Sequence, residues 1–218
     1  MHSKKYFALS FYLLSAFLLW TLAVMTIDIQ AIGPEKSSVG FAGLNGYVHT
    51  LTGVHMALYD LTDWLSLIPL MFIAGFALLG ALQWLQRKSL RKVDRSILVL
   101  GGFYLVTGAI FVFFETYVVN YRPVKIEGVL EASYPSSTTM LVICVMSTAA
   151  MQLRERIPNS KLRKWATFLM VAFTVFMVIG RLLSGVHWVT DIIGGILLSL
   201  GLVALYVVLS QKPKKRDC

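Results

Sequence analysis

Six long apolar runs, separated by short polar segments, make up most of the 218-residue chain. The first run, Tyr6–Ile27, has 22 residues without a charged side chain, enough for a helix to cross the hydrocarbon core of a bilayer. A cleaved signal peptide is the alternative for this run, but its apolar core would be unusually long and no clear small-x-small cleavage site follows it. We predict spanning helices over Tyr6–Ile27, Trp64–Leu85, Ile97–Asn120, Ser136–Leu153, a fifth that begins with Trp165–Ile179, and Trp188–Leu209.

The stretch between the first two runs, residues 28–63, is the longest polar-leaning segment. Gly33-Pro34 and Gly40 in its first half indicate a loop, whereas His49–Leu61 is mildly amphipathic and favours a short helix lying in the membrane interface. We therefore predict an all-α fold in which residues 1–218 form one domain. This domain is a bundle of six transmembrane helices, and residues 28–63 lie outside the bilayer.

Composition agrees with this architecture and excludes an ordinary soluble domain. The chain is 57% hydrophobic and 14% charged, and its mean hydropathy is +0.71, values typical of membrane proteins. Cys144 lies in an apolar run and Cys218 ends the chain, so no disulfide framework is predicted. None of the four histidines lies near a cysteine or in an HExxH arrangement, so we expect neither a bound metal nor another cofactor.

The basic residues predict how the bundle is oriented. The net charge is +9, and sixteen of the twenty Lys and Arg residues fall before the first run, in 86–95, in 154–164 or in the basic tail 211–218. These segments all lie on one side of a six-helix bundle, and cytoplasmic loops carry the excess of Lys and Arg. Both termini are therefore predicted to be cytoplasmic. The charge is predicted to serve topology and contact with anionic lipid, with no nucleic-acid partner.

The stretch Gly180–Gly195 carries the candidate chemistry. His187 and Asp191 are four positions apart at the start of the last run, so a helix there would place both on one face. A carboxylate at that spacing can accept the proton of one imidazole nitrogen and leave the other free as a nucleophile or base. The alternative is an interfacial histidine beside a helix-capping aspartate. Arg181 precedes His187 across a predicted turn at Ser184-Gly185.

Two other segments reach the same outer rim of the bundle. The third run ends at Arg122-Pro123, and the fourth begins at Ser136 and Ser137. The guanidiniums of Arg122 and Arg181 offer forked donors suited to phosphate oxygens, and a helix N-terminus at Ser136 favours an anion. Together with His187 these are the parts for phosphoryl transfer through a phosphohistidine. A substrate approaching from the membrane would be a lipid phosphate.

Three motifs in this order resemble those of the type-2 phosphatidic acid phosphatase superfamily, which are Lys-x6-Arg-Pro, Pro-Ser-Gly-His and Ser-Arg-x5-His-x3-Asp. The corresponding stretches here are Glu115-x6-Arg122-Pro123, Pro135-Ser136-Ser137-Thr138 and Gly180-Arg181-x5-His187-x3-Asp191. Order, spacing and the six-span layout agree over nearly the whole chain. The resemblance implies that no metal is needed. It also implies that His187 is the nucleophile and that Asp191 orients it. The phosphate ligands that it implies are Arg122, Arg181 and Ser136.

Three positions depart from these motifs, because Glu115 replaces the family's lysine, Thr138 its general-acid histidine and Gly180 its serine. The loss of the serine removes one hydroxyl contact. A threonine hydroxyl cannot act as an acid near neutral pH, so hydrolysis of a simple lipid monophosphate should suffer. A diphosphate differs, because its leaving group is a phosphate that is already stable as an anion. We therefore expect a preference for lipid diphosphates such as polyprenyl diphosphate.

Glu115 is an ionisable residue within a predicted span, which makes it a functional candidate. It lies seven positions before Arg122, on the same helical face. We favour a structural ion pair between the two over a protonated Glu115 that substitutes for the missing acid, because nearby arginines oppose protonation. His49 and His55 are less favoured substitutes and are more simply explained as interfacial residues. The connector charges either shape the entry of the substrate or are ordinary solvated charges, and we favour the second interpretation: Lys125, Glu127 and Glu131.

The sequence therefore predicts a multi-pass protein of the cell membrane that dephosphorylates lipid phosphates or diphosphates at its extracytoplasmic face. The same phosphohistidine could instead pass the phosphoryl group to another lipid or a sugar. A non-catalytic relative that binds or carries phospholipid or polyprenyl phosphate is the alternative from a different class, because two of the three motifs are altered. A small transporter ranks last, since the spans carry few buried charges and no inverted repeat is apparent.

Overall fold

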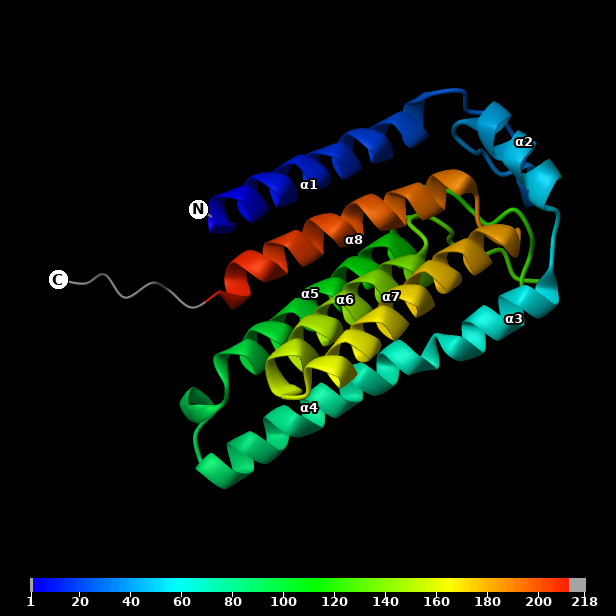
Figure 1. Cartoon of the computed structure of the whole chain (residues 1–218). Coiled ribbons are helices and arrows are strands. Elements are labelled where there is room, and N and C mark those ends of the chain that lie inside the picture. Colours follow the sequence, from blue (N-terminus) through cyan, green and yellow to red (C-terminus); the bar gives the residue numbers. More distant parts are fainter. Residues whose placement is uncertain (1, 212–218) are drawn as a thin grey trace.

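Six long helices run side by side in the computed structural model, which describes residues 2–211 (Figure 1). Two shorter helices, α2 (Ala42–Thr52) and α3 (Met56–Leu65), lie at one end of the bundle. Within the described residues the only β pairing consists of isolated bridges, so the all-α prediction is confirmed. The long helices follow the six apolar runs: α1 (His2–Thr26), α4 (Leu67–Arg87), α5 (Arg95–Thr116), α6 (Ser137–Arg156), α7 (Ser160–Leu183) and α8 (Val189–Ser210).

Five elements in this part of the chain are long and apolar enough to cross a membrane: α1, α3 with α4, α5, α7 and α8. The remaining long helix, α6, is less apolar because it packs against α4, α5, α7 and α8. Polar side chains such as Thr148 and Gln152 are buried along it. The count of six spans and the cytoplasmic position of both termini stay predictions, and residues 212–218 of the predicted basic tail lie outside the described residues.

Two clusters of buried side chains hold the bundle together around α6 and α8. One cluster joins α6 to α4, α5, α7 and α8 and includes Phe76, Val142 and Met177. The other joins α1 to α6 and α8 through residues such as Phe17 and Leu202. Because lipid is as apolar as these side chains, close packing and interhelical hydrogen bonds stabilise such contacts. Ser10 of α1 supplies one such bond, donating to the Gly201 carbonyl of α8 at 2.9 Å.

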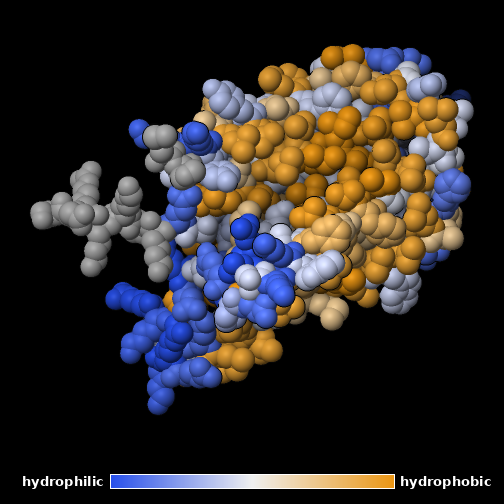
Figure 2. All heavy atoms as spheres, in the orientation of Figure 1, coloured by the Kyte–Doolittle hydropathy of each residue, from blue (hydrophilic) through white to orange (hydrophobic). Residues whose placement is uncertain are grey.

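The outer surface separates into a broad apolar area and a hydrophilic end. Figure 2 shows hydrophobic atoms over most of the visible face and hydrophilic atoms gathered at one end. In Figure 1 the start of α1 and the connection from α4 to α5 lie toward that end, whereas α2 and α3 lie at the opposite end. The connection at the hydrophilic end includes η2 (Leu90–Lys92) and an ion pair between Arg87 and Asp94 at 2.8 Å.

Two predicted boundaries at the other end of the bundle are wrong. The third helix ends at Thr116 instead of Asn120, because Pro123 disfavours helix at Arg122 and the Asn120 carbonyl accepts a hydrogen bond from the Ser133 N–H at 2.9 Å. Residues 117–122 therefore form part of the loop that carries the first motif into the site.

The predicted interfacial helix over His49–Leu61 is also wrong. Gly53 has a φ of +64°, a left-handed conformation that ends α2 and that glycine adopts at little cost. The chain restarts as α3, which leads into α4, so that Met56–Arg87 forms one apolar stretch of 32 residues. At about 1.5 Å per residue this element is longer than the hydrocarbon core of a bilayer is thick. One end of it therefore extends beyond the hydrocarbon core.

Candidate active site

The connection between α7 and α8 brings the third motif together. Ser184 and Gly185 form the predicted turn, and Gly185 has a φ of +68°. A Cβ atom at Gly185 would lie 1.9 Å from the Gly53 carbonyl oxygen, so the turn requires glycine both for its conformation and for this close backbone contact. The segments before α3 and before α8 are therefore packed directly on each other.

His187 lies in this loop and not on a helix, because α8 begins only at Val189. The expectation of one shared helical face was therefore wrong, although the two side chains still approach. His187 Nδ1 is 3.9 Å from Asp191 Oδ2, too far for a direct hydrogen bond. Asp191 also accepts from the Trp188 N–H at 3.0 Å, so the alternative role of a helix cap is confirmed.

Ser133 bridges the histidine and the aspartate. Its Oγ lies 3.0 Å from His187 Nδ1 and donates to Asp191 Oδ2 at 2.5 Å. Since the hydroxyl hydrogen is donated to the carboxylate, the hydroxyl oxygen accepts a hydrogen bond from the Nδ1–H group of His187. Asn120 Nδ2 donates to the other carboxylate oxygen, Oδ1, at 3.3 Å. This network places the imidazole proton on Nδ1 and leaves Nε2 with its lone pair.

The environment of His187 keeps its imidazole neutral. The side chain is buried, with the residue 3% exposed. Burial, together with the positive charges of Arg122 and Arg181, holds its pKa well below the usual value of 6.5, since both effects disfavour the charged imidazolium. A neutral imidazole with a free Nε2 lone pair is a competent nucleophile near neutral pH.

Two buried arginines stand beside this histidine. Arg181, in the last turn of α7, donates from Nη2 to Thr138 Oγ1 at 2.7 Å and lies 3.3 Å from Asp63 Oδ1. Arg122 Nε is 3.0 Å from Glu131 Oε2. The residues are only 2% and 7% exposed, so their charges are poorly screened by water.

Four buried nitrogens of these residues have no hydrogen-bond partner within residues 2–211: Arg122 Nε and Nη1, Arg181 Nε and His187 Nε2. Of these, Arg122 Nε is close to the Glu131 carboxylate but does not have hydrogen-bond geometry toward it. An unsatisfied buried donor is costly, and more so when it is charged, so such groups call for an explanation. Unpartnered donors from two guanidiniums and a nucleophilic nitrogen in one buried site form an arrangement suited to a tetrahedral oxyanion.

The start of α6 contributes less directly. Ser136 is buried and its Oγ caps the helix, accepting from the Thr139 N–H at 3.4 Å, while its own N–H donates to the Asp191 carbonyl at 3.1 Å. Ser137 and Thr138 line a cavity of about 370 Å³ between α4, α5 and α6. Apart from a few hydroxyls, the rest of this cavity is apolar, with side chains that include Leu70, Ile73, Phe111, Leu141 and Val145.

The predicted ion pair between Glu115 and Arg122 is not formed, because Arg122 pairs with a different carboxylate. Glu131 is the partner of Arg122, so its interpretation as a solvated connector charge was wrong, whereas Glu115 is exposed in the last turn of α5. His49 Nε2 lies 3.1 Å from the Gly185 carbonyl oxygen, in the loop between α7 and α8. His55 is exposed, and its Nε2 lies 2.9 Å from the Thr52 carbonyl oxygen.

Comparisons with known proteins agree with this geometry. The sequence profile of the PAP2 superfamily matches residues 111–215. Phosphatidylglycerophosphatase B of Bacillus subtilis (strain 168) is 28% identical over 200 residues, which cover 91% of this chain and 89% of that protein. The crystal structure of a transmembrane PAP2 type phosphatidylglycerolphosphate phosphatase from Bacillus subtilis has a TM-score of 0.60 at 21% identity, covering 91% of this chain and 93% of that one. The PAP2 superfamily match covers the part of the chain that holds all three motifs.

One departure from the PAP2 motifs has a structural reason. Gly180 stands where the family motif has serine, and a Cβ atom at Gly180 would lie 2.8 Å from Thr62 Cγ2. Real Cβ atoms do not approach other atoms so closely. The glycine therefore accommodates the close packing of α3 against α7.

Several residues of this site were not predicted from the sequence. Ser133 and Asn120 each lie two positions from a motif residue, but nothing in their local sequence marks them. The contribution of α3 had a detectable signal: Tyr59, Thr62 and Asp63 have the i, i+3, i+4 spacing of one helical face. Thr62 accepts a hydrogen bond from Arg181 Nη1 at 3.3 Å.

Proposed function

We propose that this membrane protein is a lipid phosphatase that works through a phosphohistidine at His187. The unpartnered nitrogens around one buried site carry the proposal, because they supply a nucleophile and the donors of two positively charged guanidiniums. The family and the Bacillus subtilis relatives, which are named as phosphatases of a phosphorylated phospholipid, support lipid phosphatase activity in general.

In the first step His187 Nε2 attacks phosphorus, a P–N bond forms, and the P–O bond to the leaving group breaks. The Nδ1 proton stays on the imidazole and continues to donate to Ser133, whose hydroxyl donates to Asp191. Arg122 Nη1 and Arg181 Nε stabilise the charge on the phosphoryl oxygens. Water then attacks phosphorus, the P–N bond breaks, and inorganic phosphate leaves.

The apolar cavity beside Ser137 and Thr138 supports a lipid as the substrate. It lies between α4, α5 and α6 and contains about 370 Å³, within the range of ligand pockets. Its polar end adjoins Arg181 through Thr138. If the arginines hold the phosphate group of a lipid, the apolar tail of that lipid would lie in this cavity. The polar headgroup would lie at the end of the bundle.

We further propose a preference for lipid diphosphates. The oxygen next to Arg181 belongs to Thr138, which cannot protonate a leaving alkoxide near neutral pH. Loss of a general acid costs roughly 10²–10⁴-fold where protonation is needed and less where the leaving group is a phosphate. Because the arginines supply the positive charge, we also expect hydrolysis to continue in EDTA.

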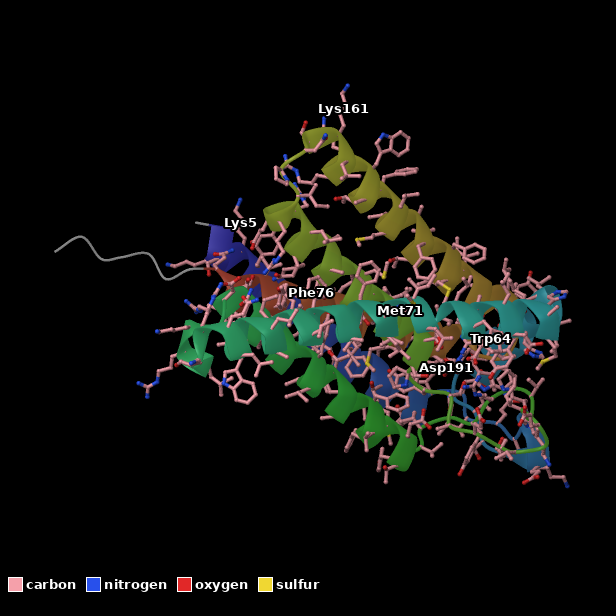
Figure 3. All side chains as sticks on the ribbon, turned by 90° about the horizontal axis from the view of Figure 1, so that it is seen from below. Lys5, Trp64, Met71, Phe76, Lys161 and Asp191 are labelled. Atoms are coloured by element: carbon pink, nitrogen blue, oxygen red, sulfur yellow. The ribbon has the colours of Figure 1, made fainter. Side chains whose placement is uncertain are left out.

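We propose that the site faces away from the cytoplasm. Figure 3 has Trp64 and Asp191 toward one end of the molecule and Lys5 toward the other. The basic connections from α4 to α5 and from α6 to α7 join helices at the end opposite α3 and the α7–α8 loop. Since Lys and Arg gather in cytoplasmic loops, the motif end would lie outside.

The test is phosphate release by the purified protein in lipid, with polyprenyl diphosphate, phosphatidylglycerophosphate and phosphatidic acid offered separately. We expect release that is fastest from the diphosphate and that is lost in His187→Ala, with exposed His55→Ala as the control. Equal release from the monophosphates would overturn the diphosphate preference.

A lipid-phosphate-binding protein without turnover is the second candidate, favoured by the threonine at position 138. It predicts no release from any substrate, together with binding of inorganic phosphate that His187→Ala leaves intact because the arginines hold the anion. Lipid phosphate that co-purifies with the inactive wild-type protein would support this candidate.

A further inference from the structure

Helix α3 contacts the phosphate-binding arginines, although no family motif lies on it. Arg181 donates to Thr62 Oγ1 at 3.3 Å and pairs with Asp63 at 3.3 Å. Asp63 is 57% exposed in its side chain, so this pair on its own contributes little. The ring of Tyr59 lies on the same face of α3 and makes the more informative contact.

Both guanidiniums lie over the Tyr59 ring. Arg181 Cζ is 4.8 Å from the ring centroid and Arg122 Cζ is 5.8 Å from it. Both distances fall within the range of a cation–π interaction, which strengthens when the cation is shielded from water. Two like charges in one site repel each other, and the shared ring offsets part of this repulsion while it fixes where each guanidinium lies.

The approach of α3 depends on the small size of Gly180. A Cβ at this position would lie 2.8 Å from Thr62 Cγ2 and 3.8 Å from Leu58 Cδ1. Threonine is β-branched and its χ1 angle is restricted in a helix, so its methyl group cannot easily turn away. A side chain at Gly180, next to Arg181 in sequence, would therefore push α3 away from the site.

We propose that Tyr59 is a positioning residue for both phosphate-binding arginines. We also propose that glycine at position 180, in place of the family's serine, leaves the space that α3 needs to bring Tyr59 to them. The proposal rests on the proposed function in one respect, that Arg122 and Arg181 bind a phosphate group. It assigns to α3, a segment outside the three motifs, the task of fixing their geometry.

The test measures binding of inorganic phosphate to the full-length protein in lipid nanodiscs by calorimetry, so that turnover is not needed. Tyr59→Leu removes the ring face and should weaken phosphate binding by roughly 5–30-fold. Tyr59→Phe keeps the ring face and should bind within about twofold of wild type. Equal binding by Tyr59→Leu and wild type, or equal weakening by Phe and Leu, would overturn the proposal.

A second pair of variants does not alter Tyr59 itself. Gly180→Ser, which restores the family's own residue, should weaken phosphate binding by roughly 5–10-fold, because overpacking shifts α3. Adding Thr62→Ser removes the obstructing methyl, keeps the hydroxyl that accepts from Arg181, and should return binding to within about twofold. Gly102→Ser is the matched control, since a Cβ there meets nothing within 4 Å.

The outcomes separate the two proposals. If wild type does not bind phosphate and Arg181→Ala changes nothing, the proposed phosphate site itself fails. If wild type binds, Arg181→Ala does not, and Gly180→Ser binds as wild type does, the phosphate site stands and the role of α3 is refuted.

Discussion

The two sides of the active site satisfy their polar groups in opposite ways. On the Asp191 side, both carboxylate oxygens are engaged, by Ser133 and the Trp188 N–H on Oδ2 and by Asn120 on Oδ1. On the arginine side, Arg122 Nη1 and Arg181 Nε are buried and without partners among the described residues. One side therefore fixes the nucleophile through protein contacts, whereas the other side keeps its donors for a ligand.

The largest effect should come from the side with unpartnered donors. Arg181→Lys keeps the charge and loses the planar fork and the stacking on Tyr59, so kcat/KM for lipid diphosphate should fall by roughly 10²–10³-fold, the range for removing one transition-state donor. Steady-state phosphate release measures this. Arg87→Lys, at the opposite end of the bundle, is the control, and a loss below threefold in Arg181→Lys would show that the fork is not used.

A substitution on the Asp191 side should have an intermediate effect on activity. Ser133→Ala removes the bridge between His187 and Asp191 while the two side chains remain, so we expect kcat to fall by roughly 10–100-fold, the range for loss of an orienting partner, with little change in phosphate affinity. Parallel measurements of kcat and phosphate binding distinguish the two sides. A fall in affinity with unchanged kcat would contradict this division of roles.

The smallest expected effect is on the pH dependence of stability. The folded-state pKa of His187 lies below its ordinary value of 6.5, so between these two values the unfolded chain binds a proton that the folded protein does not. Stability should therefore fall as the pH drops below about 6.5. Arg122→Gln removes one of the two nearby positive charges and should raise the pKa of His187.

Histidine NMR titration of ¹³C-labelled protein measures this shift, with His187→Ala to assign the signal. A His187 signal that titrates at or above 6.5 in the wild-type protein would show that burial and the two arginines do not keep the imidazole neutral.

The positions of the long helices were predictable because contact with lipid demands an apolar surface over a fixed length. Their ends were not, because the structure there is decided by contacts far away in sequence. Asn120 leaves the helix to meet Ser133 and Asp191, and no pattern within the third run marks that change. Apolarity alone also placed the second span at Trp64 and so separated α3 from α4.

The residue pair at the centre of the site was predicted on an incomplete argument. A spacing of four between His187 and Asp191 fits one helical face, but it fits equally an aspartate that caps a helix with the histidine just before it. The structure nevertheless brings these two side chains together, through Ser133. Ser133, Tyr59 and Glu131 could not be assigned, because their roles depend on how separate segments pack.

The buried polar character of α6 has a consequence for how the chain enters the membrane. Helix α6 carries Thr138, Thr148 and Gln152 on buried faces, so its transfer into lipid is less favourable than that of its neighbours. It is absent from the elements in residues 2–211 that are apolar enough to span a bilayer alone. Its covering partners α7 and α8 are synthesised after it. We therefore expect α6 to insert stably only together with these later helices, so that the residues of the second motif reach their place only after α7 and α8 have been synthesised.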